Sequence, residues 1–194
     1  MDSKNLREVE KELIKKNIEN RAKLKKKGEI ILNSEFDDEI MEDIFFDLKD
    51  IIKDKTVEEI TLYINSNGGD VDALMPLVDI IDSSSKPVNT VVLGKAYSCG
   101  AMLLLSGHKG KRSAYKHSGI LIHEVSADFG YNKNSQFKQD AEYLERINKM
   151  LVDMLKNRTK MTATHIKKYM DSNIDIFITS DDALKYGIID KIIK

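Results

Sequence analysis

The stretch VNTVVLGKAYSCGAMLLL, residues 88–105, decides the fold. Its first half is rich in valine and ends at Gly94, which is typical of a buried strand. Its second half is continuously apolar over residues 101–105, as in a buried helix. The stretch therefore predicts a strand over 88–94 and a helix over 97–106, with Ser98 at the junction between them.

A serine at the start of a buried helix has two interpretations. The first turn of a helix leaves backbone N–H groups unpaired, and the helix dipole favours negative charge there, so Ser98 could be a nucleophile beside an oxyanion site. Serine is also a favoured N-cap, which would be a purely structural role. Cys99 could compete as the nucleophile, although Ser98 fits the start of the helix better.

The rest of the chain alternates between strand and helix patterns. We expect strands over 29–32, 59–66, 88–94, 119–123 and 188–193. We expect helices over 37–52, 71–83, 97–106, 133–160, 163–170 and 181–186. Residues 108–117 are polar and are interpreted as a loop. Alternating strands and helices predict an α/β domain with a mainly parallel sheet.

The N-terminal residues are interpreted separately, and we predict a charged helical segment over 1–28 followed by a single domain over 29–194. Apolar residues recur at helical intervals in this segment, at Leu6, Val9, Leu13, Ile14 and Ile18. The stripe favours an amphipathic helix that lies on the body or on a neighbouring subunit. A solvated tail is the alternative.

Composition excludes several classes of protein. A formal net charge of −1 gives no general attraction to nucleic acid or acidic membranes. The single cysteine excludes an intrachain disulfide and a cysteine-based zinc site. No apolar run approaches the roughly 20 residues that span a bilayer, and the N-terminus lacks the apolar core of a secretory signal. We expect a cytoplasmic protein that holds neither a metal nor a cofactor.

The carboxyl ends of parallel strands meet at one edge of a sheet, where working sites collect. Here these ends carry a Gly-Gly turn within 65–69, Ser98 within 95–99, and His123 within 123–125. Of the four histidines, His123 alone follows an apolar strand directly, so it is the candidate base. The remaining histidines are expected at the surface: His108, His117 and His165.

The Gly68–Gly69 pair also has two interpretations. It could be an ordinary turn, or it could allow close approach of a substrate and direct N–H groups at an oxyanion, with the N–H of Cys99 as a second donor. A third, orienting carboxylate cannot be assigned from spacing, and the candidates in the C-terminal region are Asp171, Asp175, Asp181 and Asp182.

Four segments together resemble the Clp protease proteolytic subunit, ClpP. They are LYINSNGGDV (62–71), GKAYSCGAMLLLSGHKGKR (94–112), ILIHE (120–124) and DDALKYGIIDKI (181–192). The resemblance implies Ser98 as nucleophile, His123 as general base and Asp175 as third member of a triad, with Asp171 as the fallback. It also implies oxyanion donors at the N–H groups of Gly69 and Cys99, with Gly68 as their turn partner in the substrate-binding site.

The same resemblance implies a crotonase-like fold with a protruding handle helix at about 133–160. It implies a homo-oligomer, a heptameric ring and possibly a double ring, that hydrolyses peptides or unfolded proteins supplied by an AAA+ unfoldase. No cofactor is implied.

Three departures indicate a divergent member. The segment EVSADFGYNKN (124–134) has one glycine where the family has a Gly-rich stretch, Ile174 replaces a usual arginine, and a charged helix replaces the axial loop. The alternatives are a catalytically silent ring subunit and a crotonase-type acyl-CoA enzyme.

Overall fold

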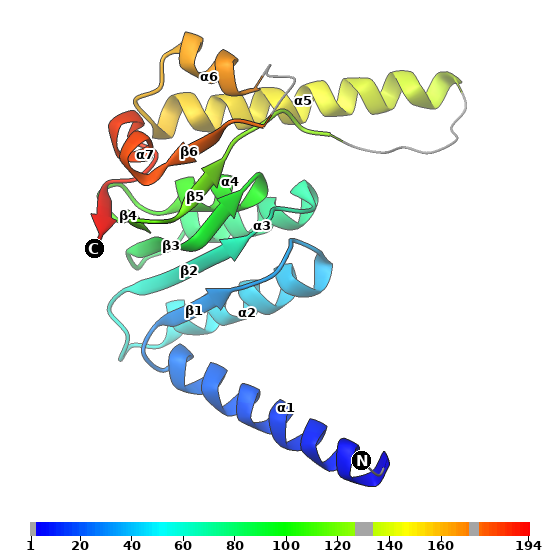
Figure 1. Cartoon of the computed structure of the whole chain (residues 1–194), viewed down its shortest axis with the longest axis vertical. Coiled ribbons are helices and arrows are strands. Elements are labelled where there is room, and N and C mark those ends of the chain that lie inside the picture. Colours follow the sequence, from blue (N-terminus) through cyan, green and yellow to red (C-terminus); the bar gives the residue numbers. More distant parts are fainter. Residues whose placement is uncertain (1–2, 127–133, 171–174) are drawn as a thin grey trace.

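The computed structural model describes residues 3–126, 134–170 and 175–194 (Figure 1). Its helices are α1 (Ser3–Lys25), α2 (Asp38–Lys53), α3 (Val71–Asp82), α4 (Cys99–Ser106), α5 (Asn134–Arg158), α6 (Ala163–Met170) and α7 (Ser180–Tyr186). Its strands are β1 (Glu29–Leu32), β2 (Ile60–Ser66), β3 (Val88–Tyr97), β4 (Arg112–Tyr115), β5 (Gly119–Leu121), β6 (Phe177–Thr179) and β7 (Lys191–Ile193). The predicted α/β class is confirmed.

The sheet is mainly parallel and branches at its longest strand. Strands β1, β2, β3, β4 and β7 lie side by side in that order, and all of their pairings are parallel. The first half of β3 pairs with β4, and its second half pairs with β5. Strand β5 then pairs antiparallel with β6. The branch extends β3 three residues beyond the predicted end at Gly94, up to Tyr97, so α4 begins at Cys99 instead of at residue 97.

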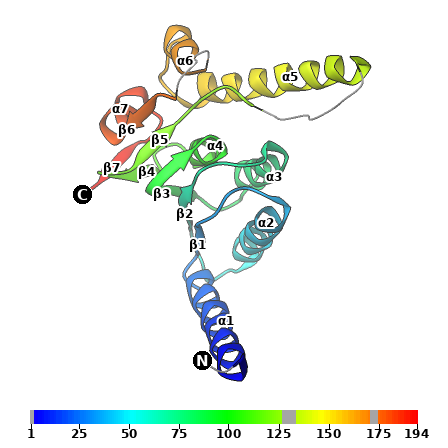
Figure 2. The same cartoon turned by 45° about the vertical axis from the view of Figure 1, so that its right-hand side comes forward.

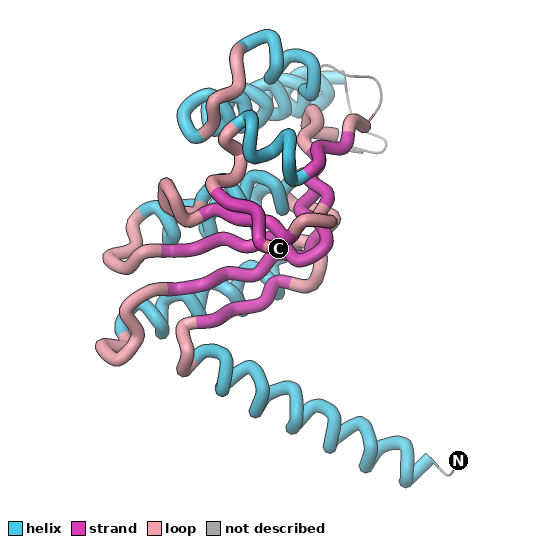
Figure 3. Tube along the Cα trace, turned by 60° about the vertical axis from the view of Figure 1, so that its left-hand side comes forward, coloured by secondary structure: helices cyan, strands magenta, loops and turns pink. Residues whose placement is uncertain are grey.

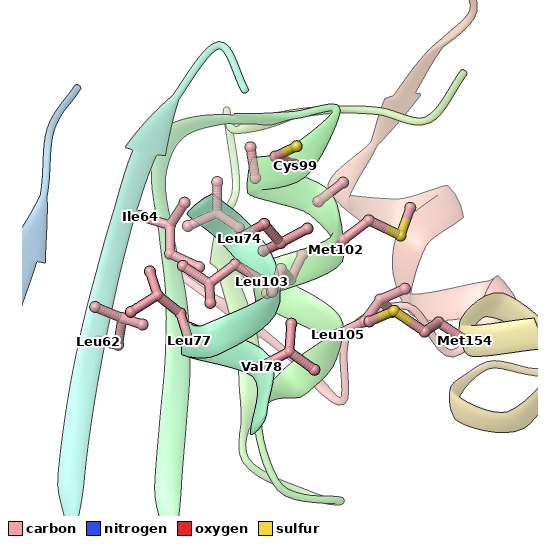
Figure 4. Packing of buried hydrophobic residues seen from close by; sticks show 14 of the residues in the cluster. Leu62, Ile64, Leu74, Leu77, Val78, Cys99, Met102, Leu103, Leu105 and Met154 are labelled. Carbon is pink, nitrogen blue, oxygen red and sulfur yellow. The ribbon is translucent and has the colours of Figure 1, made fainter. Parts of the chain in front are cut away.

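The core lies between the sheet and helices α2, α3 and α4. Alternate residues of β2 are fully buried, as the alternating pattern predicts. Figure 4 shows Leu62 and Ile64 of this strand facing Leu74 and Leu77 of α3, with Leu103 of α4 beside them. The continuous apolar run of α4 is explained by its position, since every residue of this helix is buried.

Helix α1 extends away from the body (Figures 1 to 3). Its C-terminal end is held by ion pairs of Arg21 with Asp43 and Asp47, and of Lys25 with Asp50. The residues of its apolar stripe are between 45% and 64% exposed, so the expectation that the stripe lies on the body is wrong. The helix itself is confirmed.

Other segment predictions need correction. Strand β4 lies within the predicted loop 108–117, and β6 was not predicted. Strand β5 ends at Leu121, two residues earlier than expected. His108 is half-buried and not a surface residue, because its Nδ1 accepts a hydrogen bond of 3.2 Å from the N–H of Val88. His165 is likewise half-buried, against the ring of Tyr186.

Candidate active site

A pocket of about 210 Å³ lies at the edge of the sheet where the predicted strand ends meet. Its walls include Gly69 from the turn after β2, Ser98 between β3 and α4, Cys99 at the start of α4, and His123 from the segment after β5. Leu151 of α5 contributes an apolar wall. The structure therefore brings together the glycine turn, the serine and the histidine, which are far apart in the sequence.

A larger pocket, about 480 Å³, lies elsewhere, around Arg112, Arg158 and Asp190. Its strongest charges already neutralise one another: Arg112 is paired with Asp190, and Arg158 with Asp82. This pocket holds none of the residues expected to react, so the smaller one is the candidate site.

Ser98 occupies a strained turn. Its backbone has φ 54° and ψ −120°, and it is the one non-glycine residue with positive φ in the described part of the chain. Such a conformation costs about 1–3 kcal/mol and is characteristic of functional sites. Although Ser98 precedes α4, its hydroxyl makes no capping hydrogen bond. Ser98 thus stands at the N-cap position, but its side chain does not cap the helix, so the purely structural interpretation is wrong.

The glycine turn lies directly against this serine. Gly68 has φ +108°, and a Cβ there would lie 2.7 Å from the Cβ of Ser98. The turn is held by Phe36, whose N–H donates to the carbonyl of Gly68 at 2.7 Å and whose carbonyl accepts from the N–H of Asp70 at 2.9 Å. Neither of these two bonds uses the N–H of Gly69. A Cβ on Gly69 would lie 2.4 Å from the carbonyl oxygen of Phe36, so this position requires glycine as Gly68 does.

The two predicted oxyanion donors, Gly69 and Cys99, line the same pocket as Ser98. Cys99 is the first residue of α4, so its N–H has no partner within the helix. The helix dipole adds to the attraction for negative charge. Phe36 is a residue that sequence reasoning missed, because no local pattern links it to a turn more than thirty residues away.

The thiol of Cys99 is hydrogen-bonded to the glycine turn and is not activated as a nucleophile. Its Sγ lies 3.2 Å from the carbonyl oxygen of Gly69, to which it donates. Burial raises the pKa of this thiol to about 11. A thiol with this pKa stays protonated at neutral pH, so the alternative of Cys99 as nucleophile is disfavoured.

His123 is half-buried and carries a defined tautomer. Its Nδ1 lies 2.6 Å from the carbonyl oxygen of Glu124. A carbonyl can only accept a hydrogen bond, so Nδ1 carries a proton, and in the neutral imidazole Nε2 is the nitrogen with the lone pair. Within the described residues no hydrogen bond joins His123 to Ser98.

Asp175 lies outside the pocket, is exposed, and makes no hydrogen bond to His123 in the described structure. Its position along the chain is nevertheless informative. Strands β5 and β6 pair Gly119 with Thr179 and Leu121 with Phe177. Continuing this antiparallel register by two residues would set Asp175 opposite His123.

The other candidate carboxylates are accounted for differently. Asp181 is paired with Lys116 at 2.6 Å, and Asp182 is bonded to Thr179 at the start of α7. Asp171 and Ile174 lie outside the described residues, as do residues 127–133 of the segment expected to replace the Gly-rich stretch.

A strained serine and a histidine line one pocket at the carboxyl edge of a mainly parallel sheet, and these are groups that a serine hydrolase requires. A family model described as Clp protease matches residues 11–194. The chain belongs to the Clp protease family, and its class is that of a serine-type peptidase.

Curated relatives agree with this assignment. The chain is similar to ATP-dependent Clp protease proteolytic subunit 1 of Corynebacterium glutamicum, with 34% identity over 88% of this chain and 81% of the relative. Subunit 2 of Thermobifida fusca is 35% identical, over 84% and 79%. Subunit 1 of Borreliella burgdorferi is 32% identical, over 84% and 83%.

Across residues 3–126, 134–170 and 175–194, no helix is both long and apolar enough to span a membrane.

Proposed function

We propose that this chain is the proteolytic subunit of a Clp-type protease, with Ser98 as nucleophile and His123 as general base. The observation that carries the proposal is the strained Ser98, whose side chain does not cap α4 and which lines one pocket with His123, Gly69 and Cys99.

The reaction follows from these groups. Nε2 of His123 takes the proton of the Ser98 hydroxyl as the oxygen attacks a peptide carbonyl. The N–H groups of Gly69 and Cys99 hold the resulting oxyanion. His123 then gives the proton to the leaving amine, and an acyl-serine remains. Water, deprotonated by the same imidazole, releases the acid and restores Ser98.

Asp175 completes the proposed triad when the β5–β6 ladder lengthens. Residues directly opposite in an antiparallel pair have their Cβ atoms about 4.5–5.5 Å apart. The carboxylate of Asp175 would then share Nδ1–H of His123 with the carbonyl of Glu124, which already accepts from it. The register of β6 supports Asp175 over the fallback, Asp171.

The proposed substrate is a peptide or an unfolded protein chain, and the proposed assembly is a homo-oligomeric heptameric ring, possibly a double ring. The names of the relatives, ATP-dependent protease subunits, support an ATP-hydrolysing partner, which we propose is an AAA+ unfoldase. The proposed location is the cytoplasm. Residues 29–194 would form the ClpP-like domain, and residues 1–28 an appended helical segment. The exposed stripe of α1 supports a role for this segment in contacts between subunits.

A fluorophosphonate probe tests the nucleophile. The intact assembly should become labelled on Ser98, as peptide mapping would show, and a Ser98→Ala variant should stay unlabelled. Native mass spectrometry of the same samples gives the number of subunits. A wild-type assembly that remains unlabelled and inactive on peptides would instead favour the silent ring subunit. Binding of CoA thioesters without peptidase activity would favour the acyl-CoA enzyme.

A double variant tests whether Ser98 and His123 act together. Ser98→Ala and His123→Ala should each lower kcat by several orders of magnitude, and the double variant should lose little more, because the two groups act in one step. Additive losses would contradict the assignment.

A further inference from the structure

The segment that carries His123 is not part of the sheet. Strand β5 ends at Leu121, and residues 122–125 form no helix or strand. Among the described residues, the backbone of 122–125 has one hydrogen bond to another element, from the N–H of Val125 to Oδ1 of Asn148, at 2.9 Å. This bond ties the segment to α5 two residues after His123.

The side-chain amide of Asn148 binds this segment at two points. While Oδ1 accepts from the N–H of Val125, Nδ2 donates to the carboxylate of Glu124 at 3.3 Å. Only one orientation of the amide satisfies both partners, because a backbone N–H needs an acceptor and a carboxylate needs a donor. The amide is thus fixed on both sides.

The two contacts meet at a single peptide group. The carbonyl of Glu124, which accepts from Nδ1 of His123 at 2.6 Å, and the N–H of Val125 belong to the same planar unit. Turning this unit would move the carbonyl away from the imidazole. A hydrogen bond from its N–H to Asn148 therefore fixes the acceptor that sets the tautomer and orientation of His123.

Helix α5 offers a rigid support for this contact. Ile147 and Leu151, on either side of Asn148 in sequence, are 6% and 5% exposed and belong to the core. Leu151 also lines the pocket that contains Ser98. A shift of α5 along its axis would move Asn148 and, through the peptide group, the imidazole.

We propose that Asn148 is a positioning residue: it orients the imidazole of His123 through the peptide group between Glu124 and Val125, and so makes catalysis depend on the placement of α5. The inference rests on the proposed function, since it assigns a role to Asn148 only if His123 is the base.

The main test replaces Asn148 by leucine, which has a similar shape but can neither accept nor donate. The assembled Asn148→Leu protein should lose about 10²-fold in kcat on a fluorogenic peptide, which is typical when a reacting group is misplaced, with KM changed less than about twofold. Labelling of Ser98 by a fluorophosphonate should slow in parallel. The matched control is Asn157→Leu, an exposed position on the same helix, which should leave both rates unchanged.

A second pair of variants excludes a merely structural role. Asn148→Asp keeps an acceptor for the N–H of Val125 but sets a carboxylate against Glu124, so kcat should fall partway. Adding Glu124→Gln supplies an amide donor, and the Asn148→Asp/Glu124→Gln protein should recover most of the activity. If Asn148→Leu fails to fold, the comparison of Asn148→Asp with Asn148→Asp/Glu124→Gln still tests the role of Asn148.

The outcomes separate the two levels of inference. Wild-type kcat in folded Asn148→Leu, or a double variant no more active than Asn148→Asp alone, overturns the role of Asn148. A wild-type assembly that neither hydrolyses peptides nor reacts with the fluorophosphonate overturns the proposed function instead.

Discussion

The N–H of Ser98 donates to the carbonyl of Leu121 at 2.9 Å, which joins the turn of the proposed nucleophile to the strand that ends two residues before His123. This bond continues the parallel ladder in which Tyr97 pairs with Leu121. The separation of the serine and the histidine is therefore set by backbone pairing, and any change that disturbs the end of β3 should act on catalysis.

Gly68 should tolerate no side chain. A Gly68→Ala methyl would lie 2.7 Å from the Cβ of Ser98, so the nucleophile must shift, and peptide hydrolysis should fall about 10²-fold or more. Gly110→Ala is the control: its φ of +84° carries similar backbone strain, roughly 1–2 kcal/mol, but nothing lies within 4 Å of the new methyl. Equal losses of kcat in both variants would show that strain alone, and not the contact with Ser98, is responsible.

The rings of Tyr97 and Phe177 should stabilise the strand that leads back to Asp175. They meet edge to face with centroids 5.4 Å apart, although Phe177 is 58% exposed. Urea unfolding of Tyr97→Ala, Phe177→Ala and the double variant should give a coupling energy of about 0.5–1.5 kcal/mol. Peptidase activity should fall in all three proteins, because a looser β6 weakens the register that sets Asp175 opposite His123. Additive stability losses would argue against the contact.

Cys99 should react slowly with iodoacetamide at neutral pH. Burial raises its pKa to about 11, so the reactive thiolate is scarce at pH 7 and its fraction grows as the pH approaches that value. Because the chain has one cysteine, intact mass reports alkylation at this site alone. Cys99→Ser should retain activity, since a hydroxyl can also donate to the carbonyl of Gly69. Rapid alkylation at pH 7 would contradict the burial of the thiol.

Asp190 should contribute stability that disappears in acid. Burial would raise the pKa of this carboxyl, but hydrogen bonds from Arg112 outweigh it and the net effect lowers the pKa. The contribution is therefore complete above the unfolded pKa of about 4 and is lost as the pH falls through the lower folded value. Asp190→Asn leaves the buried Arg112 without its charge partner and should cost about 3 kcal/mol at pH 7 in urea unfolding.

The difference in the free energy of unfolding between the wild type and Asp190→Asn should become smaller as the pH drops below about 4. Asp181→Asn serves as the control. Both Lys116, its partner, and the carboxylate itself are exposed to solvent. The free energy of unfolding should therefore change by no more than about 0.5 kcal/mol. A constant difference for Asp190→Asn down to pH 2 would show that the ion pair is not its cause.

The sequence by itself determined the α/β class and the candidate nucleophile and base. Sequence patterns are local: alternation marked β2, whose buried residues alternate, and a continuous apolar run marked α4, in which every residue is buried. The carboxyl-edge rule then predicted that the Gly-Gly turn, Ser98 and His123 would meet, and the structure confirms that they line one pocket. Strands β4 and β6 escaped this reasoning because they are short, and pairing with neighbours far along the chain defines them.

Only the tertiary structure decided how these residues are held. Ser98 has a positive φ, which its sequence does not predict. The hydrogen bonds of Phe36 to the glycine turn, and of Asn148 to the segment of His123, join parts of the chain that are distant in sequence. Such contacts leave no periodic trace, because one hydrogen bond or one close approach constrains a single position and not a repeating face. The residues of the site can therefore be found in the sequence, whereas the geometry that would make them act together is a property of the folded chain.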